Sequence, residues 1–200
     1  MGQLTLVNCS SRLKRRIFMY GLLNQALKEV VLSRSGERVW SNICAVVGVS
    51  AEDFELLVPY DDLMTYRLVD AASETLGLSR NEILQMLGSH WVTFTAQQGY
   101  GEMMALFGRD LRTCLKNLAR MHGHMGAMMP DLHPPRFVVE ERRPDLLTLH
   151  YHSNREGLSP VVAGILEGLA QKYKENIQVT HLGKERQSGH DEFEILFLSA

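Results

Sequence analysis

Cysteine is scarce in this chain of 200 residues, and no stretch stays apolar for long. The three cysteines, Cys9, Cys44 and Cys114, lie far apart and form no C-x-x-C pair. This scatter argues against a disulfide framework, a structural zinc site or an iron–sulfur cluster, and it favours a reduced, cytoplasmic chain. No apolar run approaches the ~20 residues that a membrane-spanning helix needs. A secreted, disulfide-rich or membrane-spanning protein is therefore not expected.

A surplus of charge is lacking as well. The 21 Lys and Arg residues face 23 Asp and Glu residues, which gives a net charge of -2 and no basic field for nucleic acid. The sequence also lacks G-x-S-x-G, a Walker loop, H-E-x-x-H, and a G-x-G-x-x-G motif after a strand. What it has in quantity is eight histidines and ten methionines. The chemistry is therefore best sought near the histidines.

The hydrophobic pattern changes its period along the chain. Apolar residues recur at helical spacing through most of the first half and again from Leu111 up to Pro130, where a helix is expected to end. From Leu147 to Arg155 they alternate as in a strand, and residues 177–181 and 193–197 predict a β-hairpin. Between them, Ser159-Pro160 resembles an N-cap followed by a first-turn proline. This order predicts an α+β fold.

Glycine and serine mark the expected helix ends in the first half. Gly48 and Gly77 follow apolar stripes as C-caps would. Ser79 with Glu82 three residues later has the form of a capping box that opens the next helix. Gly88 is expected to end that helix.

His122 lies on the apolar stripe of the helix that precedes Pro130. Spacing alone favours a core histidine bonded to a backbone carbonyl, and the alternative is an axial ligand to haem iron. His124 is two residues further on and points about 200° away, so it cannot join the same site. His150 and His152 share one strand face and could bind a transition metal, but a solvated face is the preferred interpretation.

The opposite face of that strand carries Tyr151, Ser153 and Arg155. A phenol, a hydroxyl and a guanidinium in a row offer three kinds of hydrogen-bond donor, and the guanidinium can grip a carboxylate with two bonds. This set suits an anionic cofactor such as haem with its two propionates, although an exposed polar face would look the same from composition.

These residues stand within a wider pattern that resembles the haem nitric oxide/oxygen-binding (H-NOX) family, which includes the sensor domain of soluble guanylate cyclase and stand-alone bacterial proteins. The matching segments follow the family order: MYGL (19–22), TYRLV (65–69), WVT (91–93), GY (99–100), PPRF (134–137) and YHSNREGL (151–158). Residues 19–200 are thereby expected to form one haem-binding gas-sensor domain. Residues 1–18 are expected to be an N-terminal extension.

The resemblance implies a fold and a set of roles. It implies a helical N-terminal lobe and an α/β C-terminal lobe with an antiparallel sheet, with haem b held between them. His122 matches the proximal iron ligand of the family, and Tyr151, Ser153 and Arg155 match its propionate-binding residues. Three further positions match residues that pack against the haem: Pro130, Leu23 and Trp91.

The position that carries a distal tyrosine in oxygen-binding members is Val161 here, and valine cannot donate a hydrogen bond to bound oxygen. To stabilise bound oxygen, a different tyrosine such as Tyr100 would have to reach the iron and donate the hydrogen bond instead. The resemblance thus implies a sensor that binds nitric oxide and carbon monoxide, has no catalytic activity, and signals by rupture of the iron–histidine bond. Because the chain ends directly after the hairpin, we expect a separate effector, either a histidine kinase or a cyclic-di-GMP enzyme.

Three other functions stay open. A haem enzyme acting on peroxide or nitric oxide would need a distal acid–base pair, and no motif places one. An oxygen-binding member of the same family would need a distal donor. A protein that kept the fold but lost the cofactor is a further alternative.

Overall fold

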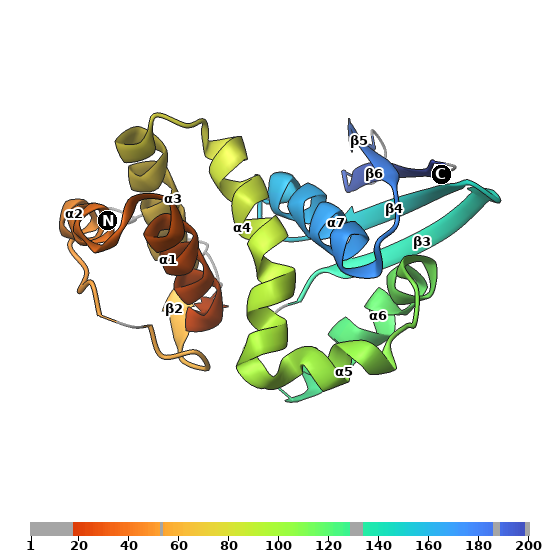
Figure 1. The fold of residues 1–200 in the computed structure, drawn as a ribbon, viewed down its shortest axis with the longest axis horizontal. Coiled ribbons are helices and arrows are strands. Elements are labelled where there is room, and N and C mark those ends of the chain that lie inside the picture. The colour runs from red at the N-terminus through yellow and green to blue at the C-terminus, as the bar shows by residue number, and fades with distance from the viewer. Residues whose placement is uncertain (1–17, 53, 129–133, 186–188, 199–200) are drawn as a thin grey trace, which may run out of the picture.

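The computed structural model describes residues 18–52, 54–128, 134–185 and 189–198, and it has an α+β fold (Figure 1). The N-terminal part is helical, with one small two-stranded ribbon. Its elements are β1 (Phe18–Tyr20), α1 (Gly21–Ser35), α2 (Glu37–Val47), β2 (Pro59–Asp61), α3 (Asp62–Leu76), α4 (Arg80–Thr95), a π turn η1 (Ala96–Tyr100) and α5 (Gly101–Leu106). The long helix α6 (Leu111–Met128) then leads into the sheet.

The C-terminal part is a four-stranded antiparallel sheet with one helix against it. Its elements are β3 (Arg136–Arg143), β4 (Leu146–His152), α7 (Ser159–Tyr173), β5 (Ile177–Lys184) and β6 (Asp191–Phe197). The strand order is β3-β4-β6-β5, so β4 is central and β5 pairs with β6 as the predicted hairpin. The predicted fold class is confirmed. The helix α7 begins one residue earlier than expected, because Leu158 rather than Ser159 is its N-cap.

Several helix ends form as the sequence predicts. Gly48 and Gly77 end α2 and α3 with φ of 78° and 66°, a left-handed conformation that glycine adopts without the clash of a Cβ. At the start of α4 the Ser79 hydroxyl accepts from the Glu82 backbone N–H, and the Glu82 carboxylate accepts from the Ser79 N–H at 2.8 Å. The capping box is confirmed.

The prediction that Gly88 ends its helix is wrong, since α4 continues to Thr95. A Cβ at Gly88 would collide with the Val161 carbonyl of α7, and a Cβ at Gly164 would collide with the Gln85 carbonyl of α4. Glycine at this position therefore serves a close crossing of two helices. The tertiary contact outweighs the low helix propensity of glycine.

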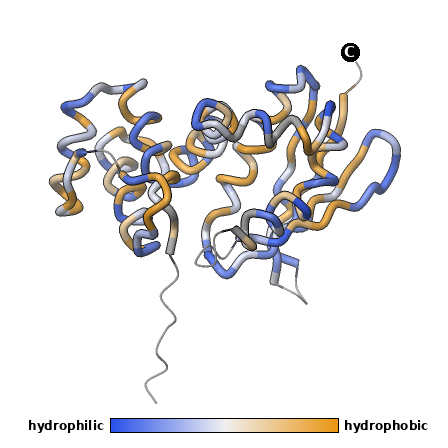
Figure 2. The backbone as a smooth tube through the Cα atoms, turned by 90° about the horizontal axis from the view of Figure 1, so that it is seen from below, coloured by the Kyte–Doolittle hydropathy of each residue, from blue (hydrophilic) through white to orange (hydrophobic). Residues whose placement is uncertain are grey.

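The helices α4 and α7 join two hydrophobic cores. One core lies among the N-terminal helices and includes Phe94 and Val161, and the other lies between the sheet, α6 and α7 and includes Val92 and Leu166. Ile165 packs against both. Hydrophobic segments accordingly run through both halves of the chain (Figure 2). None of the helices in the described part of the chain has the length and apolar character that a bilayer crossing needs.

Candidate cofactor site

A cavity of about 260 Å³ lies between the helical part and the sheet. Its walls come from α1, α4, α6 and α7 and from strands β3 and β4, and most of its lining side chains are apolar. Well-packed interiors contain few voids larger than a water molecule, so a space of this size is built to hold a ligand.

Every predicted site residue that the structure describes lines this cavity. The set comprises Leu23, Trp91, His122, Tyr151, Ser153, Arg155 and Val161. Pro130 lies outside the described residues, and so does the side chain of Tyr100. The fold thus brings together residues from α1, α4, α6, β4 and α7 that are far apart in the sequence.

His122 reaches the cavity from α6 in a defined orientation. Its Nδ1 lies 2.9 Å from the backbone oxygen of Leu118, and because a carbonyl can only accept, Nδ1 carries the proton. The lone pair is therefore on Nε2. Burial lowers the pKa of the imidazole, which keeps the ring neutral, and the ring lies 4.9 Å from that of Phe137. His124 is exposed and bonds the Arg120 carbonyl instead.

The three polar residues at the end of β4 form a connected group. Tyr151 is only 5 % exposed, and burial raises the pKa of its phenol, partly offset by a hydrogen bond to Ser153. The Ser153 hydroxyl accepts from the backbone N–H of Arg155 at 3.0 Å. The Arg155 side chain, 8 % exposed, donates from Nε to Asp62 at 2.9 Å. Polar donors therefore concentrate at one part of an otherwise apolar cavity.

No motif in the sequence singles out Asp62, but the structure places its carboxylate against Arg155. It is the first residue of α3, where a carboxylate also favours the helix N-terminus. One turn later on the same helix, the Tyr66 hydroxyl donates to the backbone oxygen of Glu156, and burial raises its pKa to about 12. Arg155 is 93 positions away from Asp62, so the sequence offers no local signal for the roles of Asp62 and Tyr66. Together they tie α3 to the segment after β4.

Another part of the cavity wall is apolar. Val161 of α7 and Leu23 of α1 contribute only hydrocarbon, and Trp91 packs at a ring distance of 6.2 Å from Phe94. Thr95 also lines the cavity, but its hydroxyl donates to the Trp91 carbonyl of its own helix at 2.7 Å. This wall therefore offers little that could bond a polar ligand.

Comparison with known proteins agrees with this arrangement. The family model described as "Haem-NO-binding" matches residues 20–181. The chain belongs to this family. An H-NOX domain is a haem-binding gas-sensor domain related to soluble guanylate cyclase.

Several relatives of this H-NOX domain are much longer proteins. Soluble guanylate cyclases gcy-32 and gcy-34 of Caenorhabditis elegans are 26 % and 27 % identical over 176 residues, which is 86 % of this chain and 26 % of each relative. The soluble guanylate cyclase subunit beta-2 of Rattus norvegicus is 32 % identical over 91 residues, which is 46 % of this chain and 13 % of that protein. The chain thus spans about a quarter or less of these relatives.

Solved structures show the same fold. An oxygen-binding H-NOX domain related to soluble guanylate cyclases, in its oxygen complex, matches with a TM-score of 0.76 and 22 % identity, covering 90 % of this chain and 96 % of that one. A mutant H-NOX protein from S. oneidensis in the Fe(II) ligation state matches with a TM-score of 0.81 and 17 % identity, covering 90 % and 97 %.

The cavity of this H-NOX domain fits haem by its chemistry. Its apolar walls suit a flat hydrophobic ring, and His122 offers a neutral imidazole whose Nε2 holds a lone pair. The hydroxyl, phenol and guanidinium groups at the end of β4 suit acidic groups on the edge of that ring.

The preferred interpretation of His150 and His152 as a solvated strand face is wrong for His150. Its residue exposure is 8 %, because β4 is an inner strand of the sheet and the ring packs against His190 and Glu192. His152 is half-buried at the end of the same strand.

Proposed function

We propose that this domain binds haem b with His122 as its iron ligand, senses nitric oxide, and regulates a separate signalling effector. The observation that carries the proposal is the orientation of His122. Its Nδ1 is committed to the Leu118 carbonyl, so Nε2 is the available ligand atom at the cavity wall. An N–H bond to a backbone carbonyl is also how ligating histidines are held in their tautomer and made more basic.

Haem, when bound, supplies an iron atom that takes a diatomic gas, with carbon monoxide as a second expected ligand. The chain holds the group at its acidic edge through Tyr151, Ser153 and Arg155. Asp62 engages the Nε of Arg155 at 2.9 Å and so fixes the plane of the guanidinium, which makes it a positioning residue. Both oppositely charged side chains are nearly buried, so their bond is poorly screened.

Selection of nitric oxide over oxygen is proposed from the apolar wall. Bound oxygen carries partial negative charge that a hydrogen-bond donor stabilises, whereas nitric oxide and carbon monoxide need no such bond. Val161 provides no donor, and the Thr95 hydroxyl donates within its own helix. Among the described side chains of this wall, the indole N–H of Trp91 is a further donor to test, and in Trp91→Phe we expect the aerated ferrous spectrum to be unchanged.

Transmission is proposed to run through α6. His122 is bonded to Leu118 on that helix, and the helix packs against β3. A displacement of the His122 ring when its bond to iron breaks is therefore passed to both α6 and β3. A histidine kinase or cyclic-di-GMP enzyme in the cytoplasm is the proposed effector class, on the resemblance to stand-alone members. Affinity pull-downs with unliganded and nitric-oxide-bound protein test this step, and identical partners and affinities in both states would contradict it.

His122→Gly is the direct test of haem ligation, with His124→Gly as its matched control. We expect His122→Gly to lose the five-coordinate ferrous haem spectrum and to regain it with added imidazole. His124→Gly is expected to keep the wild-type spectrum, because its side chain is outside the cavity. A wild-type spectrum of His122→Gly without imidazole would contradict the proposal.

A further inference from the structure

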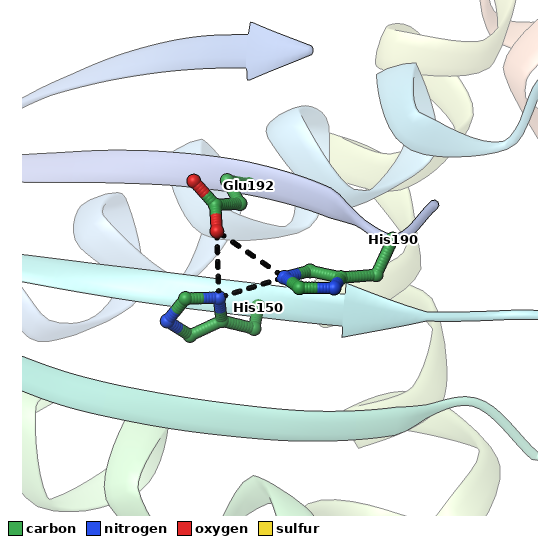
Figure 3. A group of neighbouring side chains, drawn as sticks. All are labelled: His150, His190 and Glu192. Carbon is green, nitrogen blue, oxygen red and sulfur yellow. Dashed lines mark hydrogen bonds and ion pairs between the residues drawn. The ribbon is translucent and has the colours of Figure 1, made fainter. Parts of the chain in front are cut away.

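A second group of metal-ligand side chains lies on the sheet, away from His122. It consists of His150 on β4, His190 in the turn before β6, and Glu192 on β6 (Figure 3). His150 and Glu192 are directly opposite each other in the β4–β6 register, and His190 reaches back to them from the turn. Alternation along both strands puts this face opposite to the buried side chains Leu149 and Phe193.

The three ligand atoms form a nearly regular triangle. The Nδ1 of His150 lies 2.9 Å from the Nε2 of His190 and 3.1 Å from the Oε1 of Glu192, and the third side is 3.2 Å. With bonds of about 2.0–2.1 Å, neighbouring ligands of a tetrahedral zinc ion are about 3.3 Å apart. The side chains therefore already stand near the spacing that such an ion requires.

Hydrogen bonding alone does not account for this convergence. Each imidazole nitrogen in the triangle carries at most one proton, and the carboxylate only accepts. Two of the three contacts can be hydrogen bonds at once, so the third places two lone pairs or two N–H groups against each other. The side chains are 11 % exposed for each histidine and 23 % for Glu192, which limits relief by water. A cation at the centre makes all three contacts favourable.

The surroundings supply an outer shell and an entry path. An oxygen of Glu140 lies 3.6 Å from the Nε2 of His150, on the side of the ring away from the triangle, and Glu140 also pairs with Arg142 at 3.0 Å. At 3.6 Å this contact is not a hydrogen bond, and the buried Nε2 of His150 has no hydrogen-bond partner in the described part of the chain. A slightly closer approach of Glu140 would let its carboxylate orient the ring and raise its basicity, as carboxylates behind ligating histidines do. A polar hollow lined by His152, Asn154 and His190, among others, opens beside the cluster.

We propose that His150, His190 and Glu192 bind a divalent transition-metal ion of the zinc class, with an open position for water. Two imidazoles and one carboxylate suit zinc and leave a tetrahedral ion one ligand short. The ion ties the central strand β4 to β6 and to the turn that precedes it. This site is independent of the haem proposal, since none of its three ligands lines the haem cavity.

The test is equilibrium dialysis of the tag-free, chelator-treated full chain against Zn²⁺ at neutral pH, with metal analysis of both compartments. We expect one bound zinc per chain at micromolar free zinc. Glu192→Gln and His190→Ala are each expected to weaken binding by more than about 100-fold, above the range typical of outer-shell changes, and Glu140→Gln by about 10-fold. Glu192→Gln preserves shape, so it remains informative if His190→Ala does not fold.

His181→Ala is the matched control, because His181 lies on the same hairpin but bonds Asp191 on the other face of β6. It is expected to keep wild-type zinc affinity. Absence of stoichiometric zinc in the wild type, wild-type affinity in Glu192→Gln, or equal loss in His181→Ala would each overturn the assignment. The haem absorption spectrum of every variant, expected to match the wild type, separates this result from that of the haem proposal.

Discussion

Replacing Gly164 with alanine should weaken the junction between the two parts of the molecule. The added Cβ would meet the Gln85 carbonyl and the Ser89 amide nitrogen of α4, which are backbone atoms that cannot rotate aside. Overpacking of this kind typically costs about 1–3 kcal/mol, and rigid neighbours favour the upper end. Alanine recovers about 1 kcal/mol through its better helix propensity. The free energy of unfolding is therefore expected to fall by about 2 kcal/mol.

Thermal unfolding followed by circular dichroism measures this change, at matched haem content. A loss of about 2 kcal/mol corresponds to a fall in Tm of about 4–8 °C for a chain of this size. Gly123→Ala on α6 is the matched control, because Gly123 is exposed and nothing lies within 4 Å of the position of its Cβ. That variant should be more stable than wild type by up to about 1 kcal/mol. Equal stability of the two variants would refute the packing argument.

Other predictions follow from the cavity and from the capping box. Arg155→Lys keeps the charge but loses the planar fork, and we expect faster haem transfer to apomyoglobin; wild-type retention by Arg155→Ala would contradict this. Asp62→Asn should lower the free energy of unfolding in urea by about 2 kcal/mol, because a nearly buried ion pair loses one charge. Ferrous protein in air should stay unligated, and Val161→Tyr tests whether one hydroxyl confers an oxygenated spectrum. Ser79→Ala should cost about 1 kcal/mol at neutral pH. The bond from the Glu82 backbone N–H to the Ser79 hydroxyl does not depend on pH. The bonds that the Glu82 carboxylate accepts from Ser79 lower the pKa of Glu82, so their stabilisation is present above pH 4.5 and is lost as the pH falls through the lowered pKa, which urea unfolding at pH 7 and pH 3.5 would show as a smaller effect of Ser79→Ala at the lower pH.

The sequence by itself determined the local elements whose signals are local. The capping box at Ser79 and the C-caps at Gly48 and Gly77 depend on neighbouring residues and backbone conformation, and both kinds of cap are present in the structure. The strand predicted from Leu147 to Arg155 forms as β4 but ends at His152, before Ser153 and Arg155, and side chains on both of its faces are buried. Alternation along this strand separated Tyr151 from His150 onto opposite faces of the sheet. The family pattern added the set of cavity residues, which no local rule could have joined.

Only the tertiary structure decided features that depend on distant partners. Glycine often ends a helix, so Gly88 by itself predicts a helix end. The close approach of α7 instead makes Gly88 a packing residue within a longer helix. Asp62 acts on Arg155 across 93 positions, and no spacing rule reaches that far. His150 is buried and meets His190 because strand order places β6 beside β4, and sequence alternation states which face a side chain takes but not what stands opposite it.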